Sequence, residues 1–233
     1  VDESYIGPLS TRKAYGHALV EMFPQHPDMV VLDAETSNST FSDAFMKAHP
    51  DKFFEMFIAE QNMVGVAVGL ALRGKMPFVS TFAAFLSRAF DQLRTAQYSG
   101  AHINVAGSHA GVSIGEDGAT QMGLEDIAMF RTFLNSTVLY PADHVSTEKL
   151  TSEMAHTKGI TYIRTTRGNT ETLYDPKDDF PIGGSKVLRH SKNDVVTIVA
   201  AGITLYEALQ AYEDLVSEDI IVRVIDLYSV KPL

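Results

Sequence analysis

The chain has 233 residues, 45% apolar and 21% charged, so a packed core is expected and wholesale disorder is excluded. Its formal net charge of −10 argues against a general binder of nucleic acid or of membrane surfaces. No run approaches the roughly 18 apolar residues of a membrane span, and the first residues lack the apolar stretch of a signal peptide. The sequence has no cysteine, which excludes disulfides and thiolate metal sites, and we expect a cytoplasmic protein.

The first fifty residues predict helices separated by a strand. A helix is expected over residues 9–22, and Ser10 or Thr11 can cap its first turn. The elements that follow are expected in this order: a strand at 29–32, a polar loop at 35–40 and a short helix at 42–49.

Residues 53–88, FFEMFIAEQNMVGVAVGLALRGKMPFVSTFAAFLSR, carry the most informative pattern of the chain. The apolar run at 53–59 predicts a buried strand, and apolar residues spaced i, i+3, i+4, i+7 predict a helix over 61–72. The same signals repeat as a strand at 76–81 and a helix that begins near Leu86. Two strand ends and two helix starts therefore lie close together, which is where ligands bind in open parallel sheets.

Beyond this stretch the alternation of strands and helices continues. The expected elements are strands at 103–106, 137–140 and 160–165 and helices at 124–133 and 145–156. The segment 107–123 is rich in glycine and lacks periodicity, and loops of that length inside compact domains are commonly functional. The alternation predicts the α/β fold class, a parallel sheet flanked by helices.

The composition divides the chain into a first domain at 1–167, a polar linker at 168–193 and the start of a second domain at 194–233. Within the last two segments we expect a short strand at 186–188 and a strand–helix–strand unit at 195–200, 205–215 and 220–225. Because a single unit of that size is too small to be stable alone, the second α/β domain is expected to be truncated.

Three residues at the two central junctions are candidates for a binding site. Glu60 lies where the first strand gives way to its helix, and Phe82 and Phe85 follow the second strand. A carboxylic acid beside an aromatic wall suits a flat heterocycle with a ring nitrogen to protonate. Each residue also has an ordinary explanation, since helix dipoles favour a carboxylate in the first turn and phenylalanines at i, i+3 are common in cores.

These residues lie in motifs that closely resemble a known family. IAEQNM and STFAAFLSRAFDQLR are similar to the pyrimidine-binding domain of transketolases, which are thiamine diphosphate enzymes. The resemblance extends from about Thr11 to the C-terminus through TRKAYG, NSTFSDAF, GSHAGVSIGEDGATQM, LEDIAMFR, YPAD and IRTTR, and is closest to the branch that includes the animal enzymes.

The resemblance implies how thiamine diphosphate would be bound. Glu60 matches the glutamate that bonds ring nitrogen N1′ of the aminopyrimidine and promotes its imino tautomer, acting as a general acid. Phe85 matches the aromatic residue that packs on the pyrimidine, and Phe82 is expected to line the same pocket. Gln121 matches a cofactor contact at which some transketolases carry histidine, and Ala119 replaces the proline of the more usual EDGPT.

The resemblance also implies a substrate site. His109 matches a histidine that bonds the hydroxyl and carbonyl region of the ketose, and Asp117 matches a carboxylate for a sugar hydroxyl. Arg12, Ser39 and Arg167 match the three residues that hold the sugar phosphate, a role that suits the planar fork of arginine. The other histidines are not spaced as a metal site, so no metal ligand is assigned in this chain.

One family motif is missing from the sequence. Transketolases hold the diphosphate and its Mg²⁺ or Ca²⁺ ion through a GDG…N motif, whose oxygens suit a hard cation. No GDG occurs here, so we expect the pyrimidine half of an enzyme, either a fragment or one subunit of a split enzyme, with the stop inside the second domain favouring a fragment. The resemblance implies sugar phosphate substrates, a homodimer in which a partner subunit supplies the diphosphate-binding domain, and no activity of this chain alone.

Two alternatives stay open at this point. The chain could belong to another thiamine enzyme, such as deoxyxylulose-phosphate synthase or the β subunit of a 2-oxo-acid dehydrogenase, although these usually lack the paired NSTFS and GEDG motifs. It could instead be a non-catalytic homologue, which the intact Glu60, His109 and both phosphate arginines argue against. The pathway and the preferred sugars stay undecided.

Overall fold

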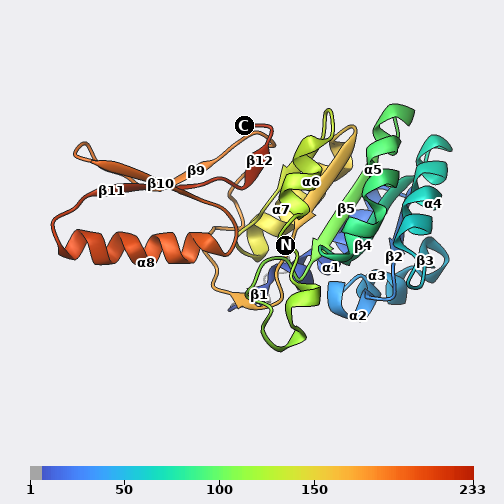
Figure 1. Cartoon of the computed structure of the whole chain (residues 1–233), viewed down its shortest axis with the longest axis horizontal. Helices are drawn as coiled ribbons and strands as arrows, with labels where there is room; N and C mark the ends of the chain where they lie inside the picture. Colours follow the sequence, from blue (N-terminus) through green and yellow to red (C-terminus); the bar gives the residue numbers. More distant parts are fainter. Residues whose placement is uncertain (1–6) are drawn as a thin grey trace.

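The computed structural model describes residues 7–233, and its core is a seven-stranded sheet (Figure 1). The strand order is β12-β6-β7-β5-β4-β2-β3, and every neighbouring pair is parallel except β12 with β6. The strands are β2 Met29–Asp33, β3 Phe53–Glu55, β4 Met76–Phe82, β5 Ile103–Ser108, β6 Thr137–Leu139, β7 Ile160–Arg164 and β12 Ser229–Lys231. The predicted α/β fold class is confirmed.

Helices cover both faces of this sheet because its strands are apolar on both sides. Successive side chains of β2 alternate between the faces: Val31 joins one buried cluster, while Val30 and Leu32 join the other. The helices that contribute to the Val31 cluster are α1 (Thr11–Met22), α3 (Asp43–Ala48) and α7 (His144–His156), and those of the opposite cluster are α4 (Glu60–Leu72), α5 (Phe90–Ala96) and α6 (Asp126–Thr132).

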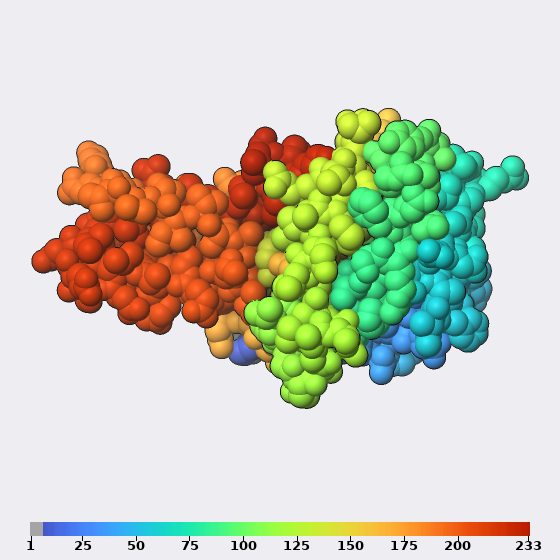
Figure 2. Space-filling model, in the orientation of Figure 1, coloured from blue at the N-terminus to red at the C-terminus, as the bar shows by residue number. Residues whose placement is uncertain are grey.

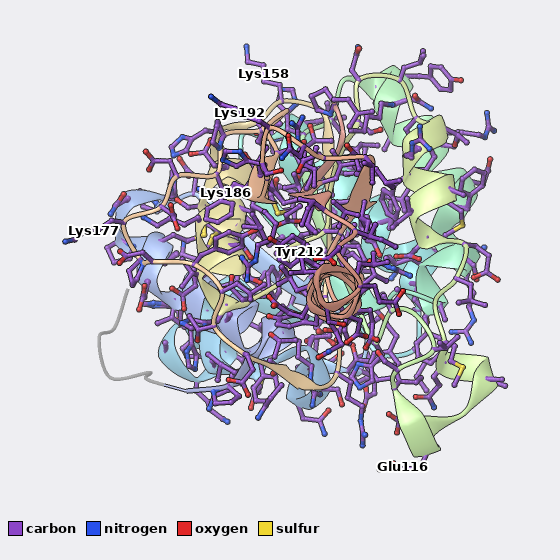
Figure 3. All side chains as sticks on the ribbon, turned by 90° about the vertical axis from the view of Figure 1, so that its left-hand side faces the viewer. Glu116, Lys158, Lys177, Lys186, Lys192 and Tyr212 are labelled. Carbon is purple, nitrogen blue, oxygen red and sulfur yellow. The ribbon has the colours of Figure 1, made fainter. Side chains whose placement is uncertain are left out.

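The C-terminal segment forms a second, smaller α/β unit. Its strands β9 (Lys186–Arg189), β10 (Val196–Ala200) and β11 (Val222–Asp226) pair in the order β10-β11-β9, and helix α8 (Thr204–Ser217) packs on them through Leu205 and Ala208. Figure 2 shows this unit, coloured orange to red, as a lobe that projects from the main body. In Figure 3, Tyr212 marks α8 seen along its axis.

Two connections tie this lobe to the main sheet. Strand β12 leaves the lobe and pairs antiparallel with β6, a connection that was not predicted from the sequence. Asp143 caps helix α7 by accepting a hydrogen bond from the N–H of Ser146, and its other oxygen accepts the N–H groups of Leu173 and Tyr174. The hydroxyl of Tyr174 donates to Asp226, at the end of β11, so the segment between the two units is anchored at both ends.

Three local predictions from the sequence are wrong. The strand predicted at 53–59 stops at Glu55, whose carboxylate accepts the N–H of Phe57 and turns the chain, leaving Phe57 exposed. The predicted loop at 35–40 contains a short helix, α2 (Ser37–Thr40). Neither Ser10 nor Thr11 caps α1, because Thr11 Oγ1 instead accepts the N–H of Thr166 at 2.9 Å.

The remaining elements are short. Strands β1 (Leu9–Ser10) and β8 (Asn169–Thr170) form an antiparallel pair. The 3₁₀ turns are η1 Phe23–Gln25, η2 Pro50–Lys52, η3 Phe85–Ala89, η4 Gln97–Ser99, η5 Gly115–Asp117 and η6 Ala119–Gln121. Helix α5 therefore begins later than predicted, after η3. Within residues 7–233, no helix combines the length and apolarity needed to cross a bilayer.

The buried carboxyl of Asp226 makes the stability of the fold depend on pH. Burial raises its pKa to about 7, which the hydrogen bond from Tyr174 opposes. A raised pKa means that the folded state holds this proton more tightly than the unfolded state. The resulting stabilisation is full below the ordinary pKa of 3.8 and is lost as the pH rises through about 7.

We therefore expect Asp226→Asn to flatten the fall in melting temperature between pH 5 and pH 8, measured by thermal unfolding. In a domain of this size, each kcal/mol of stability that no longer depends on pH reduces the fall in melting temperature by roughly 2–4 °C. Asp178→Asn is the matched control, because the pKa of exposed Asp178 is lowered by its hydrogen bond to Lys186 and does not titrate in this window. Identical slopes in the wild type and Asp226→Asn would contradict the assignment.

Candidate active site

Glu60 opens helix α4 at the carboxyl edge of the sheet. Its side chain is 3% exposed, and Oε1 accepts a hydrogen bond from Nη1 of Arg88. No hydrogen bond among the described residues reaches Oε2, so one oxygen of this buried acid is available to a ligand. A hollow of about 530 Å³ lies beside it, lined by Ile58, Ala59, Glu60, Gln61, Asn62 and Arg88.

A stack of rings lies at the ends of β4 and β5. Phe82 ends β4 and Phe85 begins η3, and their rings stack with centroids 5.1 Å apart and 19° between planes. On its other side the Phe82 ring stacks on His109, at 3.9 Å and 18°. The parallel register, which sets Phe82 beside Ser108, brings these rings together although they are far apart in the sequence.

His109 is buried and held in an unusual backbone conformation. It follows β5 with a φ of 55°, in the left-handed region that few residues other than glycine adopt, and it is 2% exposed. Its Nδ1 shares a hydrogen bond with Ser108 Oγ at 3.0 Å. Burial and the nearby cation of Arg12 lower the pKa of His109 to about 4, so its ring is neutral at pH 7.

The Gly-rich loop brings a carboxylate to this histidine. Asp117, in η5, lies 3.9 Å from His109 Nε2 and pairs with Arg167 Nε at 2.9 Å. That ion pair is not aligned as a hydrogen bond, so Asp117 Oδ2 is buried without a hydrogen-bond partner among the described residues. Arg167 also holds the loop, because its Nη1 donates to the carbonyl of Ile114 and its Nη2 to Glu116. Figure 3 shows Glu116 at the outer tip of this loop.

Two arginines meet beside this carboxylate. Arg12, at the start of α1, donates from Nε to the carbonyl of Arg167 at 3.1 Å and from Nη1 to the carbonyl of Ser39 at 2.8 Å. Its guanidinium also lies over the ring of Phe41, 5.1 Å from the centroid. Burial, and next the charge of Arg167, lower the pKa of Arg12. The two neighbouring guanidinium groups repel each other, so binding of an anion between them is favoured.

Gln121 lies in η6 of the same loop, partly buried, and no side-chain hydrogen bond is recorded for it within the described part of the chain. Two residues later, Gly123 packs so closely on the start of η3 that a Cβ there would lie 2.6 Å from the Cβ of Ala83 and 3.0 Å from the nitrogen of Ala84. Only glycine permits this approach. The loop that carries Gln121 is therefore held next to the aromatic stack.

The sequence analysis missed two residues that shape this site. Asp33, buried at the end of β2, accepts hydrogen bonds from Thr36, Thr40 and Ser42 and so folds the segment that carries Ser39. Burial raises the pKa of Asp33 to about 6, and these hydrogen bonds oppose the rise. Arg88 lies inside a motif used for the family resemblance, yet its own role was not considered. Asp33 could have been identified from the sequence, because it is a polar residue at the carboxyl end of a buried strand.

The nine site residues singled out from the sequence thus fall into two neighbouring groups joined by His109. One group, Glu60 with the Phe82–Phe85 stack, fits the aminopyrimidine of thiamine diphosphate, because it offers flat apolar rings and a buried acid with a free oxygen. Thr81, in the same strand end, also has a buried hydroxyl without a partner among residues 7–233. Among those residues no group of three or more side chains is arranged to hold a metal ion.

We expect Arg12→Gln to raise the pKa of His109 from about 4 towards its ordinary value of 6.5, because it removes the cation that most disfavours the protonated ring. The measurement is an NMR pH titration of the imidazole, assigned with His109→Gln. Arg131→Gln, which removes an exposed arginine from helix α6, should leave the titration unchanged. A His109 titration that is the same in Arg12→Gln and in the wild type would show that burial alone sets this pKa.

Comparisons with known proteins show which family the chain belongs to. The family model "Transketolase, pyrimidine binding domain" matches residues 7–172, and the model "Transketolase, C-terminal domain" matches residues 185–233. The chain is 54% identical to human transketolase over 226 residues, which are 97% of this chain and 36% of that protein. Mouse transketolase-like protein 2 is 54% identical over the same share of each chain.

Solved structures give the same result. A structure titled "Split gene transketolase, inactive beta4 tetramer" is 43% identical with a TM-score of 0.87, covering 97% of this chain and 73% of that one. Transketolase from Leishmania mexicana shares the fold, with 23% identity and a TM-score of 0.85. The match covers 97% of this chain and 35% of that chain. The chain spans about a third of the length of the curated relatives, and it belongs to the transketolase family.

Proposed function

We propose that this chain supplies the pyrimidine-binding half of a transketolase active site. The complete enzyme would move a two-carbon ketol unit from a ketose phosphate to an aldose phosphate. The observation that carries the proposal is the buried Glu60, with one oxygen free, at the start of a helix beside the stacked rings of Phe82 and Phe85. When bound, thiamine diphosphate would supply the carbanion that attacks the ketose carbonyl.

The residues of this chain would divide the work around that cofactor. Phe85 and Phe82 would hold the pyrimidine ring flat, and Gln121 would contact its edge. Glu60 would hold a proton at N1′ and pass it between its own oxygen and the ring nitrogen, as a general acid does. Burial favours this exchange, since water is excluded and neither group is fully solvated.

A second set of residues would hold the sugar. His109 is neutral and its Nδ1 is engaged with Ser108, so Nε2 is the nitrogen that would donate to or accept from the carbonyl and hydroxyl of the ketose. Oδ2 of Asp117, which is paired with Arg167 but has no hydrogen-bond donor among the described residues, would accept a sugar hydroxyl. Arg12 and Arg167, with Ser39 beside them, would bind the phosphate at the far end of the substrate.

The remaining half of the site would come from a diphosphate-binding domain, which would bring the Mg²⁺ or Ca²⁺ ion. We propose that this domain belongs to a partner subunit in a cytoplasmic homodimer, and that this chain is inactive without it. The solved relative described as an inactive β4 tetramer of a split-gene transketolase supports the proposed inactivity of the chain alone.

We expect Glu60→Gln to lower ketol transfer roughly 10²–10⁴-fold in the complete enzyme, because the amide cannot pass a proton to N1′. The measurement is turnover of xylulose 5-phosphate with ribose 5-phosphate, with thiamine diphosphate and Mg²⁺ in excess. Glu153→Gln, an exposed glutamate of helix α7, is the matched control and should keep full activity. The isolated chain should give no turnover. Normal activity of Glu60→Gln, or turnover by the chain alone, would refute the proposal.

The phosphate site predicts a different kinetic signature. Arg12→Gln should raise the KM for the phosphorylated ketose about tenfold or more with little change in kcat, since a hydrogen bond to a charged group is worth roughly 1.5–3 kcal/mol. A ketose of the same carbon skeleton without phosphate should show no such increase. If both donors lose affinity equally, Arg12 acts on the shape of the site rather than on the phosphate.

A further inference from the structure

Arg88 is tied to both halves of the pyrimidine site although the proposed mechanism gives it no role. It lies in η3, three residues after Phe85, and its guanidinium carbon is 4.8 Å from the centroid of the Phe85 ring. Its Nη1 donates to Oε1 of Glu60. One side chain therefore touches both the ring that would hold the pyrimidine and the acid that would protonate it.

The backbone of this turn is attached to the same helix. The carbonyl of Arg88 accepts a hydrogen bond from Nε2 of Gln61, the residue after Glu60, at 3.1 Å. Main chain and side chain of Arg88 thus both bind the first turn of α4. The planar guanidinium, stacked on Phe85, loses little freedom in this contact. Its position is consequently well defined even though its side chain is 53% exposed.

The charge of this contact has a chemical consequence. Glu60 is 3% exposed, and Arg88 is the one charged partner recorded for it among residues 7–233. An opposite charge at hydrogen-bond distance stabilises a carboxylate over a carboxylic acid. If an aminopyrimidine were bound, Glu60 would give its proton to N1′: its O–H bond would break, an N1′–H bond would form, and the electron pair would stay on Glu60 as the carboxylate that Arg88 stabilises.

We propose that Arg88 is a positioning residue for Glu60: it binds Oε1, leaves Oε2 facing the ligand, and shifts the proton shared between Oε2 and N1′ towards the nitrogen. This inference rests on the proposed function, because it requires an aminopyrimidine at the site. The hollow that Glu60 and Arg88 line together is the place where the two groups and the ligand would meet.

The first test needs no cofactor. The splitting between the antisymmetric and symmetric carboxylate stretches in the infrared spectrum of the whole chain, assigned to Glu60 by the difference from Glu60→Gln, reports a hydrogen bond made to one of the two oxygens. We expect Arg88→Gln to shift this splitting, because it removes the hydrogen bond that Nη1 donates to Oε1. Arg88→Lys should restore most of the wild-type splitting, since an ammonium group can donate to the same oxygen.

Arg94→Gln is the matched control. Arg94 lies six residues farther along the chain, in helix α5, is 47% exposed and pairs with Asp91, so its removal changes the net charge equally without touching Glu60. Its Glu60 splitting should equal that of the wild type. Equal splittings in Arg88→Gln and Arg94→Gln would overturn the proposal.

The second test uses the complete enzyme and equilibrium binding. Thiamine diphosphate is compared with an analogue whose N1′ is replaced by C–H, and the ratio of the two dissociation constants measures the contribution of N1′. We expect Arg88→Gln to reduce this preference about tenfold, because the charge-assisted hydrogen bond that holds Glu60 is lost, while Arg94→Gln leaves it unchanged. If Arg88→Gln keeps the full preference for thiamine diphosphate while Glu60→Gln abolishes it, the role of Arg88 is overturned and the proposed function stands. Failure of the wild type to bind thiamine diphosphate would overturn the proposed function itself.

Discussion

The parallel pairing of β4, β5 and β7 is the constraint on which the site depends. Its register sets Phe82 beside Ser108 and Gly107 beside Arg164, so aromatic, imidazole and guanidinium groups all emerge at one edge. Strand β5 brings Gly107 close to the Tyr162 side chain of β7, where a Cβ would lie 2.3 Å from the Tyr162 hydroxyl. A side chain at this position would displace the Tyr162 ring.

Tyr162 begins a buried network that continues into the Gly-rich loop. Its hydroxyl donates to Asp126, which also pairs with Arg164 at 2.8 Å, and Arg164 donates to the carbonyl of Gly123. Because Asp126 is fully buried, losing Arg164 would leave the carboxylate without its cationic partner, which costs roughly 3–5 kcal/mol for a broken buried pair. The network therefore anchors the end of the loop that carries Asp117 and Gln121, in addition to the contacts that Arg167 makes with that loop.

The sequence predicted the parts of this arrangement that follow from local pattern. Helix α4 was predicted nearly to the residue, since its apolar spacing agrees with the burial of Met63 and Ala67. Thr11 was misassigned because its hydroxyl bonds Thr166, a partner 155 residues away that no local rule can supply. The end of β3 was missed because a single carboxylate, Glu55, captures two backbone N–H groups and stops an otherwise apolar run. The site residues were found through motif resemblance, whereas the contact between Arg88 and Glu60 depends on side-chain geometry that spacing does not encode.

The surroundings of Glu60 bear on how a complete site would work. Ile58 lines the hollow beside it and is 76% exposed, and the neighbouring Phe57 is 66% exposed. Exposed apolar side chains next to a buried acid are a surface that another domain can cover with a gain in free energy. Covering them would also remove water from the mouth of the hollow, and every charge interaction of Glu60 would become stronger in the drier site. The same docking that would bring the diphosphate-binding half would thereby strengthen the contact with Arg88, so proton transfer at N1′ would be favoured only once both halves are assembled.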